Sequence, residues 1–179
     1  MLDASVLYSA PLTDLFVRLC IAGLYRASWS DSIHEEWMRA LLADRPDLTR
    51  EDLVRRRDAM DEALPDAAID GYEGLIPGLD LPDPGDRHVL AAAVRARTAL
   101  IVTHNLKDFP AERLEPYALE GVHPDTFACD LYYLNPKRVA AIVEAQRSDL
   151  RKPPMARADF LSRLEACGLV EFVRLIEAD

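Results

Sequence analysis

The sequence lacks the features of secreted and membrane proteins. It holds only three cysteines in 179 residues, and they lie far apart, at Cys20, Cys129 and Cys167. This excludes a disulfide framework and a cysteine-ligated zinc site, and it predicts a reducing compartment. No apolar run approaches the roughly 18 residues that a membrane span requires, and no secretory signal opens the chain. We therefore expect a cytoplasmic protein that does not enter a membrane.

The sequence also lacks several catalytic motifs and an excess of positive charge. It contains no glycine-rich phosphate loop and no G-x-S-x-G turn. Its 21 Lys and Arg stand against 31 Asp and Glu, which gives a net charge of −10. Phosphate neutralisation supplies most non-specific affinity for nucleic acids, so this charge argues against a general RNA or DNA binder. Carboxylates that bind metal cations would change that conclusion, because the cations cancel part of the excess.

Some basic residues could still form a local path for phosphates, although a run such as Arg55–Arg57 on a helix is more often a solvated face. The candidates for such a path are Arg50, Arg55, Arg56, Arg57, Lys107, Arg138, Arg147, Arg151 and Lys152.

Strand-like and helix-like segments alternate along the first two thirds of the chain, which predicts an α/β layer fold. Strands are expected at residues 2–7, 24–29, 67–69, 99–103 and 118–122. Helices are expected from about Leu12 to near Gly23 and at 30–43, 49–64 and 86–97, with capping signals at Ser32–Glu35 and Thr49–Asp52. From Pro124 onward the pattern predicts helices alone, at 125–134, 136–151, 157–167 and 169–178.

Two aspartates interrupt apolar patterns. Asp3 lies in the expected first strand, where a buried carboxylate is costly unless it is paired or binds a metal; alternatively the short strand is frayed and Asp3 is solvated. Asp86 falls in the middle of the apolar face of its helix, beside Val89 and Leu90. It therefore points toward the sheet, or it caps the helix, a role that Asp83 could also fill.

Other polar residues lie near the expected ends of strands or on the helix at 30–43. Asp108 follows the strand at 99–103, near the edge where open α/β sheets bind ligands; alternatively it forms a turn before Pro110. Glu35 and Glu36 flank the apolar arc of their helix, and the helical wheel does not decide which faces inward. His34 lies on that arc and is expected in the core.

Three or four carboxylates at one crevice, without His or Cys ligands, would bind a hard divalent cation, Mg²⁺ or Mn²⁺. A phosphate group is the usual partner of such protein-bound ions. The layout is that of metal-assisted phosphodiester hydrolysis.

Four segments carry a resemblance to a known family. Residues 2–7 match a D-x-[NS] strand end, residues 33–37 a helix with a glutamate three residues after an aliphatic, residues 83–93 a third acidic motif, and residues 101–109 a [TS]-x-[ND]-x-x-D-F ending. With these motifs the sequence resembles PIN-domain ribonucleases, and among them the VapC-type toxins of bacterial VapBC toxin–antitoxin pairs.

The resemblance implies a site and a fold. The implied catalytic, metal-binding acids are Asp3, Glu36, Asp86 and Asp108, and the implied supporting residues are Asn105, Thr103, Ser5 and Asp83. The family register thus selects Glu36 over Glu35. The implied fold is a three-layer α/β/α domain over residues 1–122, with a short, mostly parallel five-stranded sheet. Residues 123–179 resemble the helical extension of a longer branch of the family, expected to pack on that domain.

The implied activity is Mg²⁺- or Mn²⁺-dependent cleavage of RNA by a toxin. The implied partner is a VapB-like antitoxin, and the resemblance is also compatible with a homodimer. One alternative is a catalytically inactive PIN-like module that binds RNA or a protein. Another is a flavodoxin-like phosphoacceptor with Asp3 as its site, which the lack of a second acid adjacent to Asp3 disfavours. Only two residues precede Asp3, so either the first strand is very short or the natural start lies upstream.

Overall fold

The computed structural model describes residues 1–151 and 153–178. The chain divides into two compact units: unit 1 is Met1–Tyr8 with Ala27–His123, and unit 2 is Ser9–Arg26 with Pro124–Asp179. The sequence pattern predicts one division, after residue 122, whereas the structure groups helix α2 (Ala10–Ile21) with the later helices. The reason is its apolar stripe, which includes Leu12, Phe16 and Leu19 and is fully buried.

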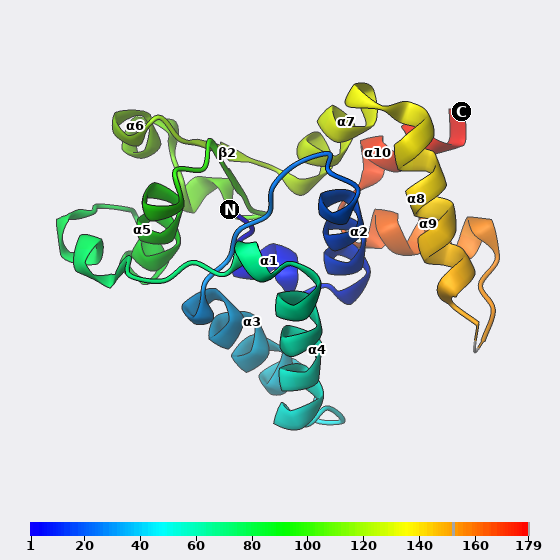
Figure 1. Cartoon of the computed structure of the whole chain (residues 1–179), viewed down its shortest axis with the longest axis horizontal. Helices are drawn as coiled ribbons and strands as arrows, with labels where there is room; N and C mark the ends of the chain where they lie inside the picture. Colours follow the sequence, from blue (N-terminus) through cyan, green and yellow to red (C-terminus); the bar gives the residue numbers. More distant parts are fainter. Residues whose placement is uncertain (152, 179) are drawn as a thin grey trace. The chain divides into compact units, whose positions relative to one another are not determined.

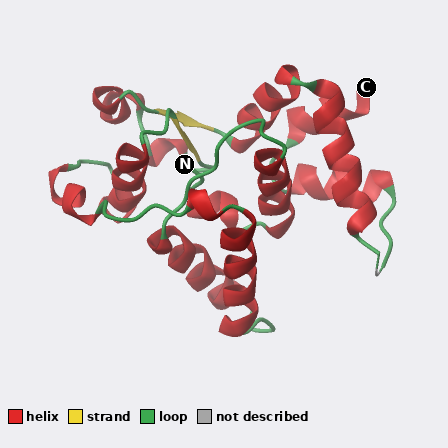
Figure 2. Ribbon diagram, in the orientation of Figure 1, coloured by secondary structure: helices red, strands yellow, loops and turns green. Residues whose placement is uncertain are grey.

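Unit 1 contains the only strands that the described part of the chain forms. Strand β1 (Leu100–Val102) pairs in parallel with β2 (Glu120–Val122), in the register Leu100↔Glu120, and Figure 2 shows this pair in yellow. The prediction of a five-stranded sheet is not confirmed. At the three other expected strands the described chain forms only isolated parallel bridges, Leu2↔Val102 and Trp29↔Ala68.

Backbone hydrogen bonds nevertheless join these extended segments in series. The amide of Asp3 donates to the carbonyl of Val102 (3.1 Å), that of Leu2 to Ser28 (2.9 Å), and that of Trp29 to Ala67 (2.9 Å). The segments meet at only one or two residues each because the chain turns away directly afterwards. After Asp3 it turns into helix α1 (Ala4–Leu7), where a continued strand was expected.

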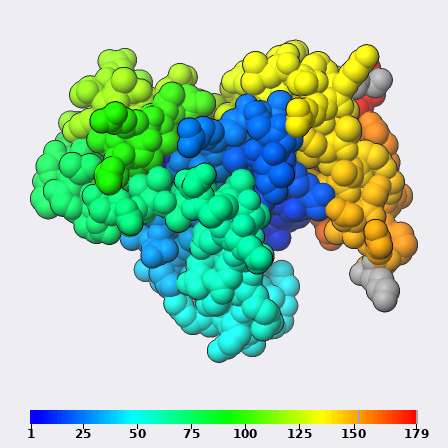
Figure 3. All heavy atoms as spheres, viewed as in Figure 1, coloured from blue at the N-terminus to red at the C-terminus, as the bar shows by residue number. Residues whose placement is uncertain are grey.

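The long helices of unit 1 begin at polar caps. Helix α3 (Asp31–Asp44) is capped by Ser30, which lies two residues before the predicted Ser32. Helix α4 (Arg50–Ala63) has the predicted capping box of Thr49 and Asp52. Helix α5 (Arg87–Ala96) is confirmed. The remaining short elements are α6 (Ala111–Leu114), η1 (Pro65–Ala67), η2 (Glu73–Gly78), η3 (Pro84–Asp86), η4 (Leu106–Asp108) and η5 (Glu115–Tyr117). Figure 3 shows the α3–α4 hairpin protruding from the rest of unit 1.

A matched polar network lies between α3 and α4. His34 is buried, as predicted, and its Nε2 lies 3.4 Å from a carboxylate oxygen of Asp61. The same oxygen accepts a hydrogen bond from the indole of Trp29 (2.8 Å), and the indole of Trp37 donates to His34 Nδ1 (3.0 Å). Burial lowers the pKa of His34, although Asp61 opposes that shift. Both indole nitrogens and both imidazole nitrogens of the network therefore have a polar partner.

Unit 2 is helical, as predicted. Besides α2 it contains α7 (Pro124–Leu134), α8 (Pro136–Asp149), α9 (Arg157–Ala166) and α10 (Val170–Ala178) (Figure 1). The carboxylate of Asp125 on α7 accepts hydrogen bonds from the amides of Glu171 and Phe172 in the first turn of α10, both at 2.9 Å. Among the described residues, no helix combines the length and apolarity that crossing a membrane would need.

Candidate active site

Asp3 is held at the end of the first extended segment by two hydroxyl groups. Only 4% of its surface is exposed, so the alternative of a solvated Asp3 is wrong. One carboxylate oxygen accepts hydrogen bonds from Ser5 Oγ (2.6 Å) and from Thr103 Oγ1 (2.8 Å). Ser5 Oγ also accepts from the amide of His104 (3.2 Å). Both predicted supporting hydroxyls, Ser5 and Thr103, therefore orient the Asp3 carboxylate.

Asp86 is a half-buried acid among other acids. Its side chain makes no capping hydrogen bond to α5, whereas that of Asp83 accepts from the amide of Gly85 (2.7 Å). Desolvation raises the pKa of Asp86, and together with the charges of Asp3, Asp83, Glu36 and Asp108 it brings that pKa to about 7. The structure thus brings Asp3, Glu36 and Asp108 within electrostatic range of Asp86, although the four acids come from separate segments of the chain.

Glu35 and Glu36 have different surroundings. Glu35 forms an exposed ion pair with Arg50, at 2.7 and 2.9 Å. Glu36 is more buried, and its carboxylate lies 3.2 Å from Nε2 of His88 on α5. This placement favours Glu36 as the inward-facing acid of the pair, which the helical wheel did not decide.

Asp108 and Asn105 lie in the turn that follows β1. Asp108 ends the 3-10 turn Leu106–Asp108 and is half-buried, and Asn105 is exposed. The amide of Asn105 donates to Thr103 Oγ1 (3.0 Å), which ties this turn to the hydroxyl that holds Asp3. Asp108 contributes its charge to the site, because it is one of the acids that raise the pKa of Asp86.

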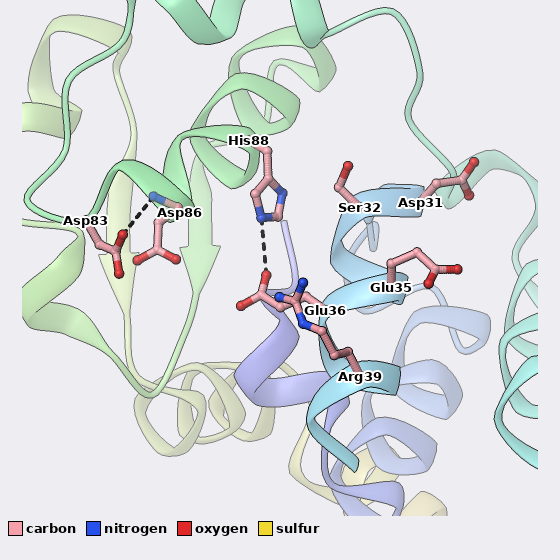
Figure 4. A pocket seen from close by; sticks show the side chains of 9 residues that line it. Asp31, Ser32, Glu35, Glu36, Arg39, Asp83, Asp86 and His88 are labelled. Atoms are coloured by element: carbon pink, nitrogen blue, oxygen red, sulfur yellow. Dashed lines mark hydrogen bonds and ion pairs between the residues drawn. The ribbon is translucent and has the colours of Figure 1, made fainter. Parts of the chain in front are cut away.

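An open pocket of about 610 Å³ lies between α3 and the start of α5. It is lined by Asp31, Ser32, Glu35, Glu36, Arg39, Asp83, Gly85, Asp86 and His88. Figure 4 shows the His88 imidazole directed at Glu36, and Asp83 beside Asp86. The lining is dominated by carboxylates, so the pocket suits a cation rather than a free anion.

The donor set fits a hard divalent cation in type and charge. Carboxylate oxygens are the ligands that Mg²⁺ and Mn²⁺ prefer, and a bound cation would offset the charges that help raise the pKa of Asp86. In the range that the structure covers, no three His, Cys, Asp or Glu side chains stand close enough to hold one ion together. Binding an ion therefore requires these carboxylates to close in on it.

Four of the nine basic residues proposed as a phosphate path form ion pairs with acids. Arg50 pairs with Glu35, Arg55 with Asp52, Arg57 with Asp58 and Arg147 with Glu144. Arg56 lies over the Trp37 ring, 4.6 Å from its centroid, and donates to the carbonyl of Leu7. Lys152 lies outside the described residues. The alternative of a solvated face fits Arg55, whose side chain is exposed, whereas Arg56 packs against Trp37.

Two features of the site were not predicted from the sequence. His88 lies two residues after Asp86 in the third acidic motif, and only the packing of α5 beside α3 reveals its contact with Glu36. His104 and His123 look scattered in the sequence, yet they follow β1 and β2 and their Nδ1 and Nε2 atoms lie 3.2 Å apart. Parallel strand pairing is the signal that could have found this pair, since it aligns the ends of both strands.

Comparisons with known proteins identify the family of the chain. A PIN domain model matches residues 1–107, more than half of the chain, and a VapC50 C-terminal domain model matches residues 124–178. The chain therefore belongs to the PIN domain family. Residues of the chain are also 39% identical, over 94 positions, to the "Putative ribonuclease VapC50" of Mycobacterium tuberculosis. That match covers 52% of this chain and 55% of the relative, so the chain spans about half of the relative's length. No solved structure matches the chain.

Proposed function

We propose that this protein is a Mg²⁺- or Mn²⁺-dependent endoribonuclease and the toxin of a type II toxin–antitoxin pair that acts in the cytoplasm. The observation that carries the proposal is the convergence of Asp3, Glu36 and Asp108 on the half-buried Asp86, whose pKa is raised by desolvation and by the charges of these acids. A chain gains nothing in stability from gathering like charges. Such a cluster is useful when it binds a cation, and the PIN domain match makes RNA the substrate to test first.

In this proposal the four acids hold the divalent ions, which when bound stabilise the charge on a phosphodiester under attack and acidify a water. Ser5 and Thr103 orient the Asp3 carboxylate through the hydrogen bonds described above. His88 orients Glu36, and Asp83 and Asn105 support the rim of the site. The roles of these residues rest on their placement and on their match to the family motifs.

The proposed partners follow from the same match. An RNA supplies the substrate, and a VapB-like antitoxin would block the site, since the relative and the second matching model carry the VapC name. Homodimerisation is part of the proposal as well. Residues 123–179 are proposed as a helical extension of the nuclease domain, packed on it.

A catalytically inactive PIN-like module that binds RNA or a protein is the second candidate. The observation that favours it is the lack, among described residues, of three potential ligands at metal-binding separation. The repulsion at Asp86 argues against it, because a module without a cation would keep that repulsion without use.

Calorimetric titration with Mn²⁺ separates the two candidates. We would compare the wild type with Asp86→Asn and with Asp58→Asn, whose acid pairs with Arg57 on the surface of α4. The nuclease proposal expects binding by the wild type and by Asp58→Asn, and at least about tenfold weaker binding by Asp86→Asn. A wild type that binds no Mn²⁺ would overturn the proposal in favour of the inactive module, and equal binding by all three would remove Asp86 from the site.

A further inference from the structure

Arg39 is an exposed arginine in the wall of the acid-lined pocket. It lies on α3 three residues after Glu36, a spacing at which glutamate and arginine commonly form an ion pair. In Figure 4 its side chain runs from the helix toward the Glu36 carboxylate. Within the described part of the chain, however, Arg39 forms neither an ion pair nor a hydrogen bond.

Three of the carboxylates that line the pocket with Arg39 are held by other groups. Glu36 is turned to the imidazole of His88, at 3.2 Å. Glu35 is held by both contacts to Arg50, and Asp83 accepts the amide of Gly85 at 2.7 Å. None of these three carboxylates pairs with the guanidinium of Arg39, which lies in the pocket wall.

Among the described residues, the lack of an ion pair at Arg39 contrasts with four other arginines on or near α3 and α4. Arg45, Arg50, Arg55 and Arg57 each form an ion pair. Arg39 is also the only arginine or lysine among the residues that line the pocket. A polyanion that enters a pocket lined by Asp31, Glu35 and Glu36 meets repulsion, and a fixed cation at the wall would offset it.

We propose that Arg39 binds a backbone phosphate of the RNA substrate, next to the phosphate that is cleaved. Its planar guanidinium can donate two parallel hydrogen bonds to two non-bridging phosphate oxygens, a geometry that the ammonium of lysine does not reproduce. The contact positions the strand and carries no sequence information. This inference rests on the proposed nuclease function and adds to it a residue that holds the substrate.

The test measures RNA affinity in the Asp3→Asn background, so that the RNA stays intact. The probe is a fluorescein-labelled, random-sequence single-stranded RNA, and its anisotropy is followed in Mn²⁺ at several salt concentrations. We compare Arg39→Gln and Arg39→Lys with the matched control Arg45→Gln. Arg45 follows the end of α3, about 9 Å further along the helix at 1.5 Å per residue, where it pairs with Asp47.

Arg39→Gln should raise the Kd for the RNA about tenfold and lower the slope of log K against log salt by about one. Arg39→Lys should fall between Gln and the parent, because it keeps the charge and loses the paired donors. Arg45→Gln should match the parent in both quantities. In the wild-type background, Arg39→Gln should bind Mn²⁺ and melt as the wild type does.

Two results would overturn the role of Arg39 alone: an Arg39→Gln variant with the parent's Kd and salt slope, or an equal loss in Arg45→Gln, which would reflect net charge. Loss of Mn²⁺ binding or of folded structure in Arg39→Gln would assign it a structural role instead. If the parent binds no RNA, the Arg39 proposal is wrong. The Mn²⁺ titration of the wild type and Asp86→Asn then decides independently whether the metal site stands.

Discussion

Helix α3 contributes to two polar clusters that are built on opposite principles. In the first, His34 meets Asp61 and the indoles of Trp29 and Trp37, so that donors and acceptors are matched. In the second, Glu36 joins a group of acids whose charges raise the pKa of Asp86. The matched cluster contributes to the stability of the fold. The unmatched cluster costs stability, which is the expected property of a site prepared for a cation.

The largest expected effect comes from changing the most buried acid of the unmatched cluster. Asp3→Asn keeps the size of the side chain and one oxygen acceptor for Ser5 and Thr103, but it removes a charge from the proposed ion site. We expect RNA cleavage in Mn²⁺ to fall on the order of a thousandfold, since metal stabilisation of the charged transition state is worth several kcal/mol.

The measurement is the rate of RNA cleavage, with a circular dichroism melt as the check on folding. Asp14→Asn, which removes an acid that pairs with Arg18 in unit 2, serves as the control. A folded Asp3→Asn protein that cleaves at the wild-type rate would remove Asp3 from the mechanism.

Glu35 and Glu36 are adjacent in the sequence, but only Glu36 belongs to the unmatched cluster of acids, so a substitution at each tests the comparison. Glu36→Gln should weaken Mn²⁺ binding by about tenfold or more, because its carboxylate is one of the proposed ligands. Glu35→Gln should leave Mn²⁺ affinity nearly unchanged, since its carboxylate is engaged with Arg50. Calorimetric titration of both variants measures the difference. The reverse order of affinities would show that the register assigned to this helix is wrong.

Breaking the matched cluster should affect stability rather than activity. Asp61→Ala leaves the buried Trp29 indole and His34 Nε2 without their acceptor, which we expect to lower the free energy of unfolding by about 1–3 kcal/mol. Asp58→Ala removes an exposed acid on the same helix and should cost less. Urea denaturation measures both values. If Asp61→Ala is as stable as Asp58→Ala, the network does not support the fold.

The smallest expected effect is a pH dependence. The pKa of Asp86 in the folded protein is raised to about 7 from its usual 3.8. The stability that protonated Asp86 provides is therefore fully present below about pH 4 and is lost as pH rises through about 7. Asp86→Asn has no such titration, so in EDTA its melting temperature should exceed that of the wild type by more at pH 8 than at about pH 5.

Thermal melts of both proteins across that range measure the difference. Mn²⁺ should remove it by stabilising the wild type selectively. Parallel pH profiles for the two proteins would show that Asp86 does not carry the raised pKa.

Local patterns predicted the helices well and the strands poorly. The capping box of α4 and the helical patterns of α5 and the four C-terminal helices are local signals within one or two turns, and the structure confirms them. The strands of this fold are short segments that pair with distant ones. At residues 2–7 the apolar run predicted a strand, but the side chain of Asp3 caps a helix at once and ends the pairing.

In the candidate site, too, local signals were readable from the sequence and long-range contacts were not. The sequence placed Asp86 on the apolar face of its helix but left open whether it points inward or caps the helix, and only the structure shows that its side chain makes no capping hydrogen bond. Glu36 could not be separated from Glu35 in this way, since both flank the apolar arc. Their difference depends on His88 and Arg50, which lie 52 and 15 residues away along the chain.

The sequence alone thus determined the α/β order, the helical C-terminal region and the residue types that a divalent cation requires. These properties depend on neighbours within a few positions, and periodicity and residue chemistry express them directly. Only the tertiary structure decided which acids meet, which bases are already paired, and that Arg39 has no partner among the described residues. Those outcomes depend on contacts between segments far apart in the chain, where packing selects one neighbour for each charge.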